Sequence, residues 1–313
     1  MPETAKVAAI DIGTNSVLLV IAAAGANGPV ALLERATITR MGEGVDRTRR
    51  LAPAAVARNL ACLRAYAEDL RCHGNPRLDV VGTSALRDAE GAAAFLDEAE
   101  RILGVRPRVI AGDEEAQLTF RGAQSGLQLR GKLLVFDIGG GSTELIVGEA
   151  SSTEPPGSRV SLDIGSVRLF ERHVHTDPPR ADELAQIDAH ITSALDGAEP
   201  LAAVAAGEAI TLVGVAGTVT TLKALELGLV TYDPAQVHGA ILTLPAVESL
   251  CAKLASLPLA ERAQLPGLEP KRADVIVAGA LIVRGILRRA GVGQAVISDR
   301  GVRFGLLEAL NAP

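Results

Sequence analysis

Short apolar runs separated by turns open the chain. Val7–Ile10 and Val17–Ala23 each have the length of one buried strand, the polar triplet 14–16 lies between them, and a second turn at 26–29 precedes another strand. Apolar runs of this length, bounded by turn residues, are typical of strands in a packed core. The pattern predicts a three-stranded meander.

A helical period replaces this pattern between residues 54 and 72. Apolar residues recur there every three or four positions, at Val56, Leu60, Leu63, Ala67 and Leu70. Pro53 stands near the predicted first turn and Gly74 just beyond the last, as is common at helix ends. We expect this helix to contribute to the core and not to chemistry.

Two strand-loop-helix units follow. A strand at 78–82 enters the loop Thr83–Arg87, with Asp88 predicted to cap the next helix, and Val109–Ile110 enters a turn before another helix. Ligand sites of α/β proteins lie at the C-terminal ends of strands. The planar guanidinium of Arg87 matches phosphate oxygens, so it is a candidate ligand; a capped turn with a surface arginine is the alternative.

The second of these helices begins with two neighbouring carboxylates, Glu114 and Glu115. Acidic residues in a first turn complement the helix macrodipole, which is the structural interpretation. A carboxylate there could instead act as a general base on water. Helical spacing does not choose between the two glutamates.

The meander pattern then returns. Its predicted elements are strands at 133–136, 145–148, 159–164, 210–215 and 294–297, a hairpin turn at 151–158, helices at 181–195 and 246–257, and a terminal helix after Arg303. The strand at 210–215 enters Ala216–Thr221, which we interpret as a small-residue loop that opens a helix and has the makeup of an anion or nucleotide contact.

The two meanders share a turn. Asp11-Ile-Gly-Thr-Asn-Ser-Val-Leu-Leu19 aligns without gaps with Asp137-Ile-Gly-Gly-Gly-Ser-Thr-Glu-Leu145. In the second copy, successive glycine N–H groups can converge on an anion, and Asp137 and Glu144 suit a magnesium ion bound to it. A tight hairpin turn would explain one copy, but its repetition favours a duplicated domain with two anion-binding loops.

Composition narrows the class of protein. The chain has 313 residues, of which 48% are hydrophobic and 22% charged, which is enough for two globular domains with full cores. The net charge of −6 and the absence of Trp argue against nucleic-acid binding. Three scattered cysteines without a Cys-x-x-Cys spacing, and no apolar run of membrane-spanning length, predict a cytoplasmic protein that binds no membrane.

Taken together, these motifs resemble the exopolyphosphatase and guanosine pentaphosphate phosphohydrolase (Ppx/GppA) family in its short two-domain form. This family lies within the actin, Hsp70 and sugar-kinase superfamily. The resemblance runs nearly from end to end and is carried by Asp11–Ser16, Thr83–Arg87, Gly112–Ala116, Asp137–Glu144, Gly217–Leu222, Arg272–Val275 and Ser298–Gly301.

The resemblance implies an α/β fold of duplicated actin-like (ribonuclease H-like) domains with an active-site cleft between them. Domain I would span residues 1–124, with a helix at 299–313 packing back on it. Domain II would span residues 125–298.

The resemblance also implies roles for individual residues. Glu115, the second glutamate of the Glu-Glu-Ala motif, would be the catalytic base, and the metal ligands would be Asp137 and Glu144, with Asp11 a further candidate. Positions that hold phosphate map onto Asn15, Ser16, Arg87, Gly139, Gly140, Gly141 and Ser142. Leu18 departs from the family pattern, because many relatives carry a basic residue there.

The implied activity is that of an exopolyphosphatase, a phosphoanhydride hydrolase that releases terminal phosphate from inorganic polyphosphate by magnesium-assisted attack of water activated by a glutamate. Hydrolysis of guanosine pentaphosphate at its 5′ end is the alternative within the family. An ATP-dependent small-molecule kinase or an actin-like nucleotide-binding assembly protein is the alternative of another class. The implied cofactor is Mg²⁺, with K⁺ as a candidate monovalent cation. A homodimer is a candidate assembly.

Overall fold

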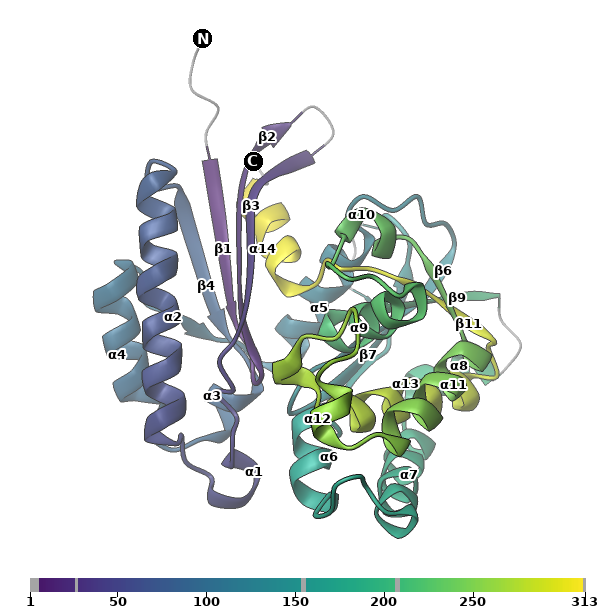
Figure 1. Cartoon of the computed structure of the whole chain (residues 1–313). Helices are drawn as coiled ribbons and strands as arrows, with labels where there is room; N and C mark the ends of the chain where they lie inside the picture. The colour runs from purple at the N-terminus through teal and green to yellow at the C-terminus, as the bar shows by residue number, and fades with distance from the viewer. Residues whose placement is uncertain (1–5, 26–27, 153–155, 206–208, 312–313) are drawn as a thin grey trace. The chain divides into compact units, whose positions relative to one another are not determined.

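The chain folds around two mixed β-sheets (Figure 1). The computed structural model describes residues 6–25, 28–152, 156–205 and 209–311. The contacts divide the chain into two units. Unit 1 comprises Met1–Gly122 and Val302–Pro313, and unit 2 comprises Ala123–Gly301. The sequence analysis predicts these boundaries at 124/125 and 298/299.

The sheet of unit 1 has the order β3-β2-β1-β4-β5. Its strands are β1 (Lys6–Ile12), β2 (Ser16–Gly25), β3 (Gly28–Ile38), β4 (Arg77–Gly82) and β5 (Arg108–Val109). The first three strands form the predicted antiparallel meander, while β4 and β5 run parallel to β1. The C-terminal ends of β1, β4 and β5 therefore lie along one edge of the sheet.

The sheet of unit 2 has the order β10-β11-β9-β6-β7-β8. Its strands are β6 (Lys132–Ile138), β7 (Thr143–Glu149), β8 (Arg159–Leu162), β9 (Ile210–Val215), β10 (Ile241–Thr243) and β11 (Gln294–Ile297). β6, β7 and β8 form an antiparallel meander, and β9 and β11 continue the sheet in parallel from β6.

The two sheets therefore share one topology. In each, the first strand pairs antiparallel with the second and parallel with the fourth, and the third strand lies at an edge. The fourth strand in turn pairs parallel with β5 in unit 1 and with β11 in unit 2. Unit 2 adds β10, which pairs antiparallel with β11. This topology confirms the prediction of a duplicated α/β domain.

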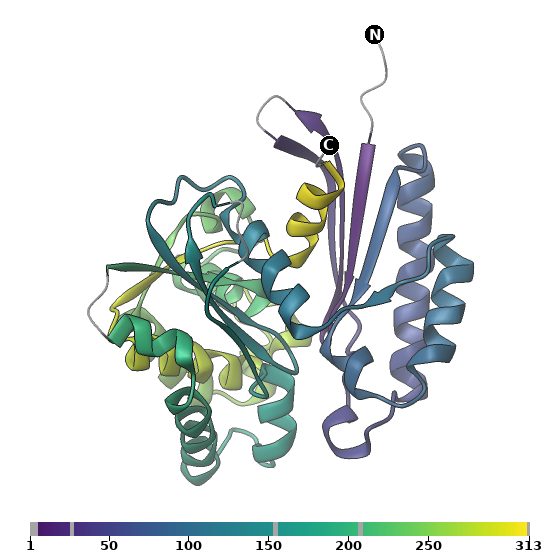
Figure 2. The same ribbon diagram turned by 180° about the vertical axis from the view of Figure 1, so that it is seen from behind.

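Helices cover both faces of the sheet of unit 1. The helices of this unit are α1 (Val45–Thr48), α2 (Pro53–Cys72), α3 (Ser84–Asp88), α4 (Ala92–Leu103), α5 (Gly112–Gln124), which continues into unit 2, and α14 (Val302–Asn311). Alternate residues of β1 point to opposite faces. Ile10 lies in the core with α2 and α4, whereas Ala9 lies in the core with α14. Figures 1 and 2 show α2 and α4 on one face of the sheet and α14 on the other.

Helix α14 packs tightly on α5 in unit 1. A Cβ atom on Gly305 would lie 2.1 Å from the carbonyl oxygen of Leu118, so only glycine allows this approach. Because α5 carries Glu115, the close contact with α14 helps to fix the helix that holds the predicted base.

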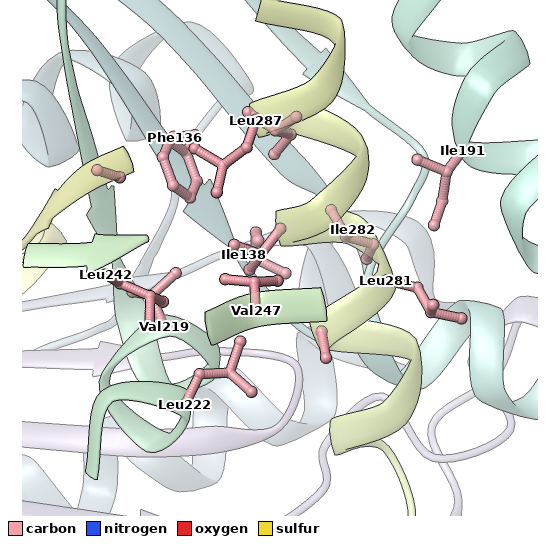
Figure 3. Packing of buried hydrophobic residues seen from close by; sticks show 14 of the residues in the cluster. Phe136, Ile138, Ile191, Val219, Leu222, Leu242, Val247, Leu281, Ile282 and Leu287 are labelled. Carbon is pink, nitrogen blue, oxygen red and sulfur yellow. The ribbon is translucent and has the colours of Figure 1, made fainter. Parts of the chain in front are cut away.

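The helices of unit 2 surround one large core (Figure 3). They are α6 (Ser166–His173), α7 (Ala181–Asp196), α8 (Glu199–Ala205), α9 (Ala216–Leu227), α10 (Pro234–Val237), α11 (Leu244–Ser256), α12 (Leu259–Arg262), the 3₁₀ helix Pro270–Arg272 and α13 (Ile276–Ala290). Phe136 and Ile138 of β6 contribute to this core together with Val247 of α11 and Leu281 and Ile282 of α13. Fully burying such a side chain stabilises the fold by about 1.5–3 kcal/mol.

The predicted helix cap at Asp88 is wrong. Asp88 ends α3, and α4 has Gly91 at its N-cap, with φ of 88°. The turn predicted at 26–29 and the hairpin turn at 151–158 lie partly outside the described residues, at 26–27 and 153–155. Among the described helices, none is long and apolar enough to cross a membrane.

Candidate active site

Both copies of the repeated turn fold in the same way. The N–H of Gly13 donates a hydrogen bond to the carbonyl oxygen of Ser16, and the N–H of Gly139 donates to that of Ser142, each over 3.0 Å. A Cβ atom on Gly13 or Gly139 would lie 3.1 or 3.2 Å from the accepting oxygen. The repeat in the sequence is thus a repeat of backbone geometry.

The second copy of the repeated turn, at 139–142, can offer backbone amides to a ligand. The N–H of Gly139 closes the turn and is not available, but the carbonyl groups of Gly139 and Gly140 accept hydrogen bonds from the first amides of α6, over 3.0 and 2.9 Å. A carbonyl and the N–H that follows it point in opposite directions in a trans peptide. The N–H groups of Gly140 and Gly141 therefore point away from α6, and they are, with the Ser142 hydroxyl, the candidate phosphate donors of this turn.

Asp137 and Glu144 face each other across the same turn. They are direct cross-strand partners in β6 and β7, so their Cβ atoms lie on one face of the sheet, roughly 4.5–5.5 Å apart. Glu144 is 2% exposed and accepts a hydrogen bond of 2.7 Å from the hydroxyl of Ser161 on β8. In the first copy, Leu18 is the partner of Asp11, so that turn lacks the carboxylate pair.

Two adjacent carboxylates fit a magnesium ion. Oxygen ligands are those that Mg²⁺ prefers, and it commonly binds through one or two carboxylates while retaining water and substrate oxygens. Within the described part of the chain, no group of three or more His, Cys, Asp or Glu side chains could hold a metal ion. A cation at Asp137 and Glu144 would therefore take its other ligands from water and substrate.

In unit 1, the first copy of the repeated turn lies beside Thr83 and the start of α3, which follow β4. The N–H of Thr83 donates to the carbonyl oxygen of Ile12 over 3.2 Å, and the hydroxyl oxygens of Thr14 and Ser84 lie 2.8 Å apart. Two of the predicted motifs, Asp11–Ser16 and Thr83–Arg87, are thus joined at the C-terminal ends of two parallel strands.

Hydrogen bonds to the Asn15 carbonyl fix the peptide that joins Asn15 to Ser16. The carbonyl oxygen of Asn15 accepts hydrogen bonds from the N–H groups of Thr39 and Arg40, each over 3.0 Å, so the N–H of Ser16 points the other way. The side chain of Asn15 is buried, and within the described ranges its Oδ1 has no hydrogen-bond partner. Rotating this amide by 180° would present its NH₂ group to an anion.

Asp11 is a buried carboxylate with a free oxygen. It is 9% exposed, and no described residue donates a hydrogen bond to its Oδ1. Burial raises the pKa of Asp11 from 3.8 to about 7, and the charge of Arg303 opposes this shift. An orphaned carboxylate oxygen of this kind fits a cation ligand.

Arg303 is a residue of this region to which the sequence analysis assigns no role. It lies on α14, is 8% exposed, and donates through Nη2 to Glu34 over 2.6 Å, while its Nε has no hydrogen-bond partner in the described part of the chain. Its charge acts on Asp11 from a helix close to 290 residues further along the chain, so no local pattern could reveal it.

Arg87 and the predicted base Glu115 form an ion pair within unit 1. The Nη1 of Arg87 donates to Oε2 of Glu115 over 3.1 Å and to the carbonyl oxygen of Ile110 over 2.8 Å. The side chain of Glu115 is 10% exposed and that of Arg87 is 29% exposed. The pair lies where β4 and β5 end, the edge at which β1 also ends.

The structure separates the two neighbouring glutamates that helical spacing leaves equivalent. Glu115 is buried beside Arg87, whereas the Glu114 side chain is 43% exposed and pairs with Arg108 over 2.7 Å. Glu114 therefore has the surface role of a first-turn charge, and Glu115 has the position of a functional carboxylate.

Two segments predicted as loops are helical. Residues 84–87 of the predicted loop Thr83–Arg87 belong to α3. Residues 216–221, interpreted as a small-residue loop, form the first turns of α9, which begins at Ala216 with φ of 70°. Thr218 and Thr220 are buried in this helix, and Thr218 donates to the carbonyl oxygen of Ile138. The packing of these side chains stabilises a helix that their propensities do not favour.

Unit 1 therefore brings together Asp11, Asn15, Ser16, Arg87 and Glu115, and unit 2 brings together Asp137, Gly140, Gly141, Ser142 and Glu144. Residues 20–311 match the Ppx/GppA phosphatase family. The chain belongs to this family. Both the predicted family and the predicted α/β fold class are confirmed.

Individual members of the Ppx/GppA family are similar along the whole chain. Exopolyphosphatase 2 of Mycobacterium tuberculosis is 39% identical over 97% of this chain and 98% of its own length. The guanosine-5'-triphosphate,3'-diphosphate pyrophosphatase of Aeromonas salmonicida is 32% identical over 97% of this chain, but over only 59% of its own length. The crystal structure of the PPX-GPPA enzyme of Aquifex aeolicus, 32% identical, superimposes with a TM-score of 0.81 over 98% of this chain and 100% of its own.

Proposed function

We propose that the chain is an exopolyphosphatase, which hydrolyses the terminal phosphoanhydride of inorganic polyphosphate. The observation that carries the proposal is the similarity to exopolyphosphatase 2 of Mycobacterium tuberculosis, which extends over almost the entire length of both chains. The pyrophosphatase from Aeromonas, in contrast, has a large part with no counterpart here.

Unit 1 supplies the base and a cation for the phosphate. Glu115 takes a proton from water as the water oxygen bonds to the terminal phosphorus. The bridging P–O bond breaks, and its electron pair leaves with the shortened chain, so the products are orthophosphate and a polyphosphate with one fewer unit. Arg87 orients Glu115 through Nη1, and its remaining N–H groups can donate to phosphate oxygens.

Unit 2 supplies donors and a place for Mg²⁺. The amides of Gly140 and Gly141 and the hydroxyl of Ser142 bind phosphate oxygens whose negative charge increases during the reaction. Asp137 and Glu144 would hold magnesium, which would neutralise charge on the phosphate oxygens. In unit 1, Asp11 is a separate candidate cation ligand, because its Oδ1 has no hydrogen-bond partner among the described residues.

Guanosine pentaphosphate is the second candidate substrate, favoured by the similarity to the Aeromonas protein. Its 5′ terminal phosphate presents the same phosphoanhydride to the same groups. The two substrates differ in the part of the molecule beyond the reacting phosphates. Their rates of hydrolysis are therefore compared in one assay.

Release of orthophosphate from the purified protein tests the proposal. The assay compares polyphosphates of several lengths, guanosine pentaphosphate, and ATP with candidate sugars, each with and without Mg²⁺. We expect magnesium-dependent release from polyphosphate. Release from guanosine pentaphosphate alone would replace the first substrate by the second, and phosphorylation of a sugar would overturn the proposal.

The proposal includes the cellular compartment of the protein. Cys62, Cys72 and Cys251 are all free thiols, which is typical of a reducing compartment, so we place the protein in the cytoplasm.

A further inference from the structure

One short stretch of chain, Gly165–Arg168, donates hydrogen bonds to three successive carbonyl groups of the turn at 139–142, the second copy of the repeated turn. The carbonyl oxygen of Gly139 accepts from the N–H of Ser166 over 3.0 Å, and that of Gly140 accepts from the N–H of Val167 over 2.9 Å. The third, that of Gly141, accepts from a side chain, the Nε of Arg168, over 2.6 Å. This stretch thus fixes the side of the turn that carries these three carbonyl oxygens.

Each held carbonyl fixes the direction of the amide that follows it. Because peptides are planar and trans, the N–H of residues 140, 141 and 142 point opposite to the carbonyls of 139, 140 and 141. The first two carbonyls are held by backbone N–H groups, and that of Gly139 also accepts from the Ser166 hydroxyl over 3.3 Å. The third, and with it the N–H of Ser142, depends on the guanidinium of Arg168.

The backbone approach behind the turn leaves no space for adjustment. A Cβ atom on Gly165 would lie 2.3 Å from the carbonyl oxygen of Gly140 and 2.5 Å from the carbonyl carbon of Gly141. Backbone atoms cannot move aside as a flexible side chain could. Any side chain at this position would push the turn forward.

The guanidinium of Arg168 is buried behind the turn. Its side chain is 8% exposed, and its Nη2 lies 3.6 Å from Oδ1 of Asp163, whose side chain is 87% exposed. Burying a charge is unfavourable unless it is paired and hydrogen-bonded. A cation fixed behind a turn that binds an anion gains a second favourable interaction, since its field is positive at the amides it orients.

We propose that Arg168 is a positioning residue of the phosphate-binding turn, which holds the Gly141 carbonyl so that the N–H of Ser142 faces the phosphate. This inference rests on the proposed function, because it assigns that turn to phosphate. Arg168 touches the turn and not the substrate. Its loss therefore acts on the affinity of the turn for phosphate.

The test compares Arg168→Gln with Arg172→Gln, which changes an exposed arginine of the same helix. We expect Arg168→Gln to raise the KM for polyphosphate and the inhibition constant of orthophosphate by about tenfold, the equivalent of one well-placed hydrogen bond. The concentration of Mg²⁺ at half-maximal activity stays as in the wild type. Gly165→Ala, which displaces the turn without removing a charge, is expected to raise the same two constants.

Calorimetric binding of orthophosphate gives a readout that does not require turnover. An Arg168→Gln protein that keeps its unfolding temperature and binds orthophosphate as the wild type does would overturn the inference while leaving the proposed function intact. An equal rise for Arg172→Gln would also overturn it, because the effect would then be one of general charge. A wild-type protein that binds orthophosphate but hydrolyses no polyphosphate would refute the proposed function instead.

Discussion

One nitrogen atom of Arg87, Nη1, donates both to Oε2 of Glu115 and to the carbonyl oxygen of Ile110. The carboxylate is therefore held in one orientation by a cation that is itself anchored to the backbone. A general base must be fixed within reach of its water to be effective. Among the described residues, none accepts a hydrogen bond from the Nε or Nη2 of Arg87, so the same guanidinium can donate to a phosphate oxygen.

Glu115→Gln tests the base directly. The amide keeps the size and most of the hydrogen bonding of the carboxylate but cannot accept a proton, so we expect turnover to fall by about 10² to 10⁴ with little change in substrate affinity. Steady-state phosphate release gives both quantities.

Glu114→Gln is the matched control, because it changes the neighbouring carboxylate at the surface. Its expected effect is mild, since a first-turn charge stabilises a helix by at most about 1 kcal/mol. If Glu114→Gln lost more activity than Glu115→Gln, with both proteins folded by circular dichroism, the assignment of the base would be wrong.

Asp137→Asn and Glu144→Gln are expected to alter magnesium dependence and activity together. Each change removes one charged oxygen ligand from the carboxylate pair, so the Mg²⁺ concentration at half-maximal activity should rise by at least about tenfold. Glu149→Gln is the control, because Glu149 is an exposed carboxylate at the far end of the same strand, β7. A magnesium titration that Asp137→Asn leaves unchanged would remove Asp137 from the metal site.

Local patterns in the sequence predicted the parts of the site that are themselves local. The turn with Asp137 and its copy at Asp11 combine strand periodicity with glycine and small polar residues, so both could be found from nine-residue windows. The repeat then predicted the duplicated sheet, because a repeated strand-turn-strand unit implies a repeated environment.

Contacts between distant segments could not be predicted in this way. Whether Glu114 or Glu115 is buried depends on Arg87, which comes from another strand-loop-helix unit. The role of Arg168 depends on a carbonyl 27 residues earlier in the chain. Residues 216–221 were wrongly interpreted as a loop because glycine and threonine are weak helix formers, and only the tertiary packing of Thr218 makes them helical.

Arg262 is expected to be a large contributor to the stability of unit 2. It is 2% exposed, and its guanidinium donates to the carbonyl oxygens of Leu254, Ala273 and Leu257 over 2.8, 2.8 and 2.7 Å. Arg262→Leu would leave three carbonyl groups without this donor, so we expect the free energy of unfolding to fall by about 3–5 kcal/mol. Urea denaturation followed by circular dichroism measures the change.

Arg289→Leu is the control for Arg262. Arg289 pairs with Asp196 at the surface, where the two side chains are 36% and 62% exposed. A change at such a site usually alters stability by less than about 0.5 kcal/mol. Equal losses for the two variants would show that the three carbonyl contacts of Arg262 do not matter.

His173 is expected to make the protein less stable in mild acid. Desolvation lowers the pKa of His173 below its ordinary value of 6.5, and the charges of Arg172 and His175 add to this, while a hydrogen bond with Gln186 opposes it. Its Nε2 lies 3.0 Å from Nδ1 of His190, on the facing helix α7.

Because the pKa of His173 is lower in the folded state, the unfolded state binds more protons below pH 6.5. The contribution of His173 to stability is therefore complete above pH 6.5 and is lost as the pH falls from there through the folded-state pKa. His173→Gln should reduce the loss of stability between pH 7.5 and 5.5 relative to the wild type. Comparing the two proteins at each pH removes the contribution of Asp11, whose raised pKa acts in the opposite direction. A His173→Gln protein that loses as much unfolding free energy as the wild type over this range would show that His173 does not control the acid sensitivity.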